Sequence, residues 1–110
     1  MKITKTDNYL LIKPNGGSIT EFVEKLIKEE KLIKENNLIL DISEKFNTDF
    51  LNLNVFLPLN KQHKQNGTSF VIIFNNAFEE DLLDELDIVP TLTEAIDIIE
   101  MDNISRDLGF

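Results

Sequence analysis

Cysteine is absent from this chain, and histidine occurs only once. The lack of cysteine excludes disulfide bonds, thiolate catalysis and cysteine-based metal sites, and it fits a reducing compartment. No apolar stretch approaches the roughly 20 residues that a membrane helix requires, and the N-terminus lacks the apolar run of a signal peptide. We therefore expect a cytoplasmic protein that binds no membrane, and we expect no cofactor and no resident metal.

Basic residues are also scarce, since 11 lysines and arginines stand against 20 acidic residues and give a net charge of −9. This balance argues against binding to nucleic acid, whose phosphates require a basic surface. Residues 1–65 carry ten basic and nine acidic side chains, whereas residues 66–110 carry eleven acidic side chains and only Arg106. We expect an acidic C-terminal surface that favours basic partners, although acidic helix faces that maintain solubility explain the same pattern.

The 110 residues, 42% hydrophobic and 28% charged, predict one soluble globular domain that spans residues 1–110. Strand patterns and helix patterns alternate in the order β-β-α-β-α-β-α-β-α. This order predicts an α/β fold with a mostly parallel central sheet, an antiparallel N-terminal hairpin, and helices packed on the sheet. The expected strands are 3–6, 9–13, 38–42, 69–74 and 87–90, and the expected helices are 19–35, 50–63, 77–86 and one that begins at 92.

Local signals mark where several of these helices begin. Ser18 with Glu21, and Thr91 with Glu94, are capping boxes, in which the hydroxyl accepts a hydrogen bond from an otherwise unpaired backbone amide. Pro58 falls inside the helix expected over 50–63. It predicts either a kink or a helix that begins nearer Leu57, because proline cannot donate a helical hydrogen bond.

The segment 38–67 runs from an apolar strand through Thr48-Asp49 into a helix that ends before Asn66-Gly67. Near the end of the chain, a short strand is followed by Pro90-Thr91 and a helix that contains Glu94-Ala95. This layout resembles that of STAS domains, the family of anti-sigma factor antagonists and sulfate-transporter tails. The resemblance implies a STAS-like fold and a non-catalytic, regulatory function in binding another protein. The alternative fold is another small parallel α/β domain, such as a flavodoxin-like receiver.

In STAS domains, an Asp-Ser-Ser-Gly-like motif opens the helix, and one of its serines is a phosphorylation switch. Asp49 matches the aspartate, whereas Phe50, Leu51 and Asn52 replace the two serines and the glycine. Thr48 is the nearby hydroxyl, but it precedes the aspartate and is better explained as a helix cap. The resemblance therefore implies a constitutive apolar contact, with no serine phosphorylation, at the partner-binding residues Thr48, Asp49, Phe50, Leu51 and Asn52.

A second hypothesis concerns carboxylates at the carboxyl end of the central strand, where α/β sheets bind their ligands. Asp41, Glu44 and Asp49 cluster there in the sequence and could receive a small cationic or metal-linked molecule. His63 lies in a polar stretch and is expected to be an exposed surface residue. Because no nucleophile–base arrangement is visible, we do not expect an enzyme.

Residues 101–110 are expected to form a C-terminal tail that ends on apolar residues. The tail could pack back on the sheet or on a helix groove, or it could be disordered. It could also dock into a partner's pocket through Ile104, Leu108 and Phe110.

Overall fold

A five-stranded sheet in the order β1-β2-β3-β4-β5 organises the chain in the computed structural model, which describes residues 1–15, 18–42, 50–74 and 85–109. Residues 50–52 are described by their backbone alone. The first two strands pair antiparallel, and every later pair is parallel. The α/β fold expected from the sequence is confirmed. The strands are β1 (Lys2–Lys5), β2 (Leu10–Lys13), β3 (Leu38–Asp41), β4 (Phe70–Ile73) and β5 (Asp87–Val89).

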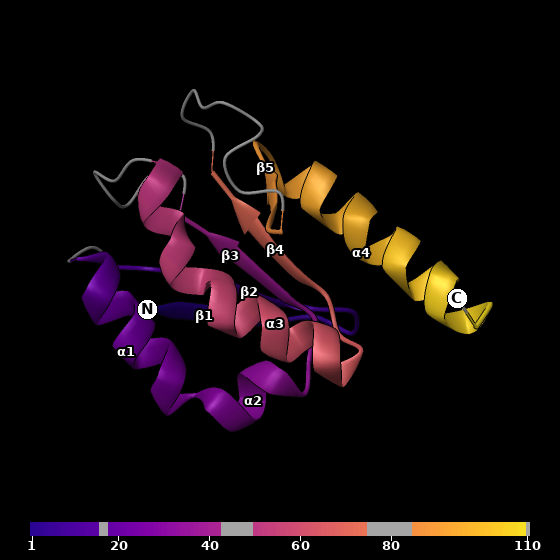
Figure 1. Ribbon diagram of the computed structural model, residues 1–110, viewed down its shortest axis with the longest axis horizontal. Helices are drawn as coiled ribbons and strands as arrows, with labels where there is room; N and C mark the ends of the chain where they lie inside the picture. Colours follow the sequence, from indigo (N-terminus) through magenta and orange to yellow (C-terminus); the bar gives the residue numbers. More distant parts are fainter. Residues whose placement is uncertain (16–17, 43–49, 75–84, 110) are drawn as a thin grey trace.

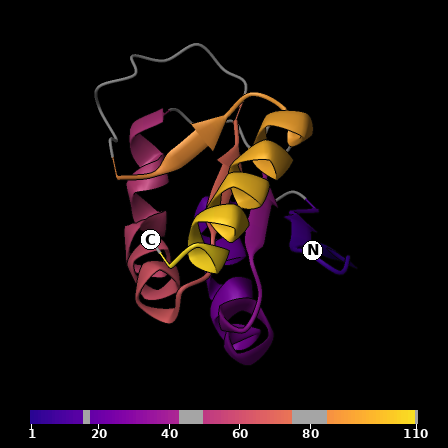
Figure 2. The same ribbon diagram turned by 90° about the vertical axis from the view of Figure 1, so that its right-hand side faces the viewer.

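The helices pack on both faces of this sheet (Figures 1 and 2). Among the described residues they comprise α1 (Ile19–Lys28), α2 (Glu30–Lys34), a 3-10 helix η1 (Phe50–Phe56), α3 (Leu57–Asn66) and α4 (Leu92–Asp107). The helix expected over 77–86 falls largely on residues 75–84, which lie outside the described residues. No helix of the described part of the chain is long and apolar enough to cross a membrane.

Three helix predictions need correction. The expected helix over 19–35 is divided at Glu29, whose backbone departs from helical geometry between α1 and α2. The expected helix over 50–63 begins as the 3-10 helix η1, and the α-helix starts only at Leu57. Pro58 lies in the first turn of α3, where its missing N–H has no intrahelical role. Of the two outcomes predicted for this proline, the later helix start is therefore the right one.

The third correction concerns the C-terminus, because residues 101–107 are not a separate tail. They continue α4, which runs for 16 residues to Asp107 and is capped by Leu108. Phe110 lies outside the described residues. At the start of the same helix, the backbone N–H of Glu94 donates to Thr91 Oγ1 over 3.3 Å, as the sequence predicts.

The two faces of the sheet have separate cores. One core joins Leu10, Leu40 and Ile72 to Phe22 of α1 and Phe56 of η1, and it extends under α2 and α3. The other core is smaller, and among the described helices only α4 covers it, lying against β4 and β5. Strand residues alternate between these cores, as the pleat requires. The second core consists of Ile39, Val71, Ile73, Ala95 and Ile99.

Gly67 ends α3 in the left-handed conformation, with φ +75°, and its N–H donates back to the carbonyl of Lys64. A side chain at this position has open space but a strained backbone.

We expect Gly67→Ala to lower the free energy of unfolding by about 1–2 kcal/mol, because alanine is strained at positive φ. Gly67→Asn should cost less, because asparagine tolerates this conformation better. Urea unfolding of the three proteins measures the difference. An alanine variant as stable as the wild type would show that the cap does not restrict this position.

Candidate functional site

Three of the five residues expected to bind a partner lie at the start of η1. Thr48 and Asp49 fall outside the described residues. The backbone of Phe50, Leu51 and Asn52 forms the first turn of η1. That these five residues bind a partner therefore stays a prediction. Several of the described residues that follow them line a groove.

Of the proposed carboxylate cluster, only Asp41 is described; Glu44 and Asp49 lie outside the described residues. Asp41 ends β3, and its Oδ2 lies 3.7 Å from Nζ of Lys13 on the neighbouring strand. This partly exposed ion pair is worth at most about 1 kcal/mol. Within the described ranges, no three His, Asp or Glu side chains lie close enough together to hold a metal ion.

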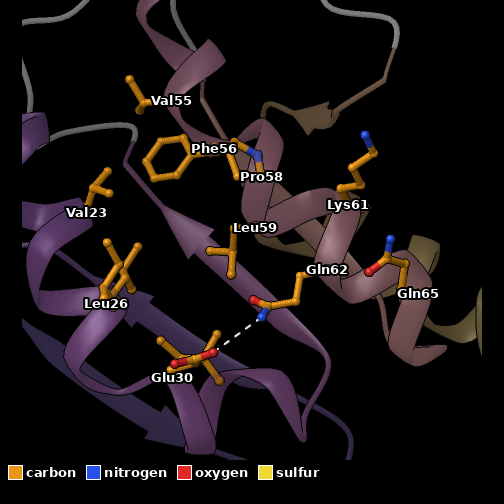
Figure 3. Close-up of a pocket in the computed structure, with 12 residues that line it drawn as sticks. Val23, Leu26, Glu30, Val55, Phe56, Pro58, Leu59, Lys61, Gln62 and Gln65 are labelled. Atoms are coloured by element: carbon orange, nitrogen blue, oxygen red, sulfur yellow. Dashed lines mark hydrogen bonds between the residues drawn. The ribbon is translucent and has the colours of Figure 1, made fainter.

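A groove of about 540 Å³ lies between α1–α2 and η1–α3 (Figure 3). Val23 and Leu26 of α1 face Phe56 and Leu59 across it. At one end, Gln62 Nε2 donates a hydrogen bond to Glu30 Oε1 over 3.4 Å. The groove is lined by Val23, Leu26, Ile27, Glu30, Ile33, Val55, Phe56, Pro58, Leu59, Lys61, Gln62 and Gln65.

Apolar side chains remain open to solvent at this groove, which we call the α1–α3 groove. Ile27 is 65% exposed and Val55 is 45% exposed, although both lie beside the buried residues Leu26 and Phe56. An apolar floor with exposed aliphatic edges is suited to contact with apolar side chains. The groove therefore has the character of a recognition surface.

A second, polar pocket of about 380 Å³ lies where the end of α3, the start of β4 and the last turns of α4 meet. Its lining includes Ser69, a residue only 3% exposed. The Ser69 hydroxyl donates to Asp102 Oδ2 over 2.6 Å and accepts from Arg106 Nη2 over 2.7 Å. The three side chains fasten the C-terminal half of α4 to the start of β4, and we call them the Ser69 anchor.

Asp87 also lines the polar pocket, at the first residue of β5. Burial raises the pKa of its carboxyl group, the nearby Asp102 raises this pKa further, and Lys64 partly opposes the shift. The Lys64 ammonium and the Asn60 amide both donate to the carbonyl oxygen of Glu85, over 3.3 and 2.9 Å. These polar groups thus hold the chain that leads into β5 against α3.

His63 is buried, which corrects the expectation of an exposed residue. Its Nδ1 lies 2.7 Å from Thr68 Oγ1, and its ring lies 5.6 Å from that of Phe70. Nε2 has no hydrogen-bond partner among the described residues. Burial lowers the pKa of His63 to about 4, so the ring is neutral at pH 7. It serves as a core residue between α3 and the sheet.

The sequence indicates part of the α1–α3 groove but does not indicate the Ser69 anchor. The helical spacing of Val23, Leu26 and Ile27 marks an apolar side of α1, but spacing does not show that Ile27 remains exposed. The Ser69 anchor joins residues more than 30 positions apart, and no local pattern signals it. Comparison with known proteins adds no relative, because no family model and no curated protein matches this chain.

The buried histidine predicts a defined pH dependence of stability. In the unfolded chain His63 is protonated near pH 6.5, whereas in the folded chain it is protonated only near pH 4. The free energy of unfolding therefore falls as the pH drops through this window. Between about pH 7 and about pH 5 we expect a loss of roughly 1–2 kcal/mol that His63→Leu does not show. Urea unfolding at the two pH values measures it. Equal losses in both proteins would contradict the assignment to His63. The pH dependence would then come from groups that the variant retains, such as Asp87.

The Ser69 anchor predicts that Ser69→Ala lowers the free energy of unfolding by about 1–3 kcal/mol, because Asp102 and Arg106 both lose their buried hydroxyl partner. Ser105→Ala is the matched control, since Ser105 lines the same pocket but is exposed. We expect it to change stability by less than about 0.5 kcal/mol. Thermal unfolding measures the stability of both variants. Equal effects would contradict the claim that the hydrogen bonds of Ser69 stabilise the fold.

Proposed function

We propose that this chain is a non-catalytic protein-interaction module, as its resemblance to anti-sigma factor antagonists implies, and that it binds its partner in the α1–α3 groove. The observation that carries the proposal is the exposed apolar groove on the segment that directly follows Phe50–Asn52. The resemblance implies a contact at this segment. The groove extends that contact along η1 and α3 and adds one side of α1.

The shape and polarity of the groove favour an amphipathic helix as the bound element. Two helices form its walls, and a third helix can place one apolar side between them. Ile27 and Val55 offer aliphatic surface at the edges, and burying such side chains is favourable by about 1.5–3 kcal/mol each when complete. Glu30, Lys61 and Gln65 supply polar groups at the margin, as interfaces do around an apolar centre.

The constitutive character expected from the sequence fits this surface. An interaction that rests on aliphatic and aromatic contact needs no added phosphate charge, in contrast to one tuned by a phosphorylated serine. The stretch 50–58 carries neither serine nor threonine and no charged residue. Binding at the groove should accordingly change little with salt concentration.

The test is a pull-down from native lysate with the wild type, Ile27→Asp and Ile104→Asp. We expect at least one protein to be retained by the wild type and by Ile104→Asp but lost with Ile27→Asp, because a charge at the groove edge must be desolvated on binding. Both isoleucines are exposed, so neither substitution buries a charge in the free protein. Thermal unfolding checks that both variants fold.

If every retained protein is held equally by Ile27→Asp, the groove is not the contact surface. A wild type that retains no protein would likewise count against an interaction module that works through this groove.

A further inference from the structure

Three large apolar side chains are exposed on the last two turns of α4. Met101 is 67% exposed, Ile104 is 59% exposed, and Leu108, at the helix cap, is 66% exposed. Residues spaced three and four positions apart lie on the same side of a helix. The three side chains therefore form one continuous row, which we call the α4 stripe.

The α4 stripe faces away from the sheet. Ala95 and Ile99 bury the opposite side of the helix in the second core, and Asp102 and Arg106 follow Ile99 on that side, where they reach Ser69. Figures 1 and 2 show α4 on the sheet face opposite α1, α2 and α3. The helix thus carries apolar residues on two sides, of which the sheet covers one.

The stripe is held in a fixed position by the Ser69 anchor. Both hydrogen bonds of the Ser69 hydroxyl go to the turn that carries Ile104, so this part of α4 is fastened to β4. A partner that binds a fastened helix does not have to order it first, which lowers the entropic cost of association.

The charges around the stripe are acidic. Glu94, Asp97, Glu100 and Asp107 are all exposed on α4. The cation of the helix, Arg106, donates instead to Ser69 and to Asn103. Two stripes packed together would bring like charges into contact, and an anionic membrane surface would be repelled for the same reason. A basic partner meets both the apolar row and its acidic border.

We propose that the α4 stripe docks a basic amphipathic helix of another protein. The apolar side of that helix covers Met101, Ile104 and Leu108, and its lysine or arginine side chains reach the carboxylates on either side. This surface lies on the opposite face of the sheet from the α1–α3 groove. The proposal therefore adds a second binding site to the proposed function and does not depend on the first.

The probe is a fluorescein-labelled peptide of about 18 residues, long enough for five helical turns. It is built from leucine at helical spacing with lysine elsewhere, and the matched peptide carries glutamate in place of lysine. Fluorescence anisotropy measures binding to the wild type, to Ile104→Ser and to Ile27→Ser, which removes an equally exposed isoleucine from the groove.

We expect the lysine peptide to bind the wild type and Ile27→Ser alike, and to bind Ile104→Ser about tenfold more weakly. The glutamate peptide should not bind the α4 stripe, so any affinity that it shows should be unchanged in Ile104→Ser. Neutralising the border with Asp97→Asn and Glu100→Gln should weaken binding and reduce its dependence on salt.

The proposal is overturned if the wild type binds neither peptide, or if Ile104→Ser binds as tightly as the wild type. Loss with Ile27→Ser alone would place the peptide in the groove, which supports the proposed function and removes the second site. Sedimentation velocity tests whether a second copy of the chain occupies the α4 stripe instead. A wild-type dimer that Ile104→Ser converts to a monomer would assign the stripe to a second copy of the chain and overturn the proposal.

Discussion

All four residues of β4 are buried, and the need to cover both sides of this strand determines where the helices lie. Phe70 and Ile72 enter the core shared with α1, α2 and η1–α3, whereas Val71 and Ile73 enter the core closed by α4. Several helices share the first face and leave a groove between them. The second face has a single described helix, so the back of that helix meets solvent. Both apolar surfaces of the molecule follow from this unequal covering of one strand.

The strands and their order could be predicted from the sequence because their signals are local. Phe70–Ile73 is apolar, aromatic and β-branched, and the alternation of strands with helices implies right-handed parallel connections. The break at Glu29 could not be predicted, since glutamate is a good helix former. The burial of His63 could not be predicted for a related reason. Its neighbours in the sequence are polar, and only the fold places its ring beside that of Phe70.

The candidate surfaces were harder to predict than the fold. Apolar residues at helical spacing normally form a core, and sequence alone does not separate Leu26, which is buried, from Ile27, which is exposed. The sequence predicts that Ile104 and Leu108 belong to a tail that packs back, docks or is disordered, whereas the structure places Ile104 on α4 and Leu108 at its cap. The contacts of Ser69 with Asp102 and Arg106 attach this part of α4 to the start of β4, and no local sequence pattern indicates them. Contacts between distant residues are the part of a structure that local patterns do not contain.

The placement of α4 opposite the other helices has an electrostatic consequence. Residues 19–34 hold four acidic and four basic side chains, α3 adds Lys61 and Lys64, and α4 holds five acidic side chains and one arginine. Among the described helices, the uneven charge along the sequence thus becomes a difference in charge between the two faces of the sheet. The two faces that these described helices cover therefore present different local charge to an approaching protein. A charged protein is attracted to one of these faces more than to the other, and the difference falls as salt screens the field.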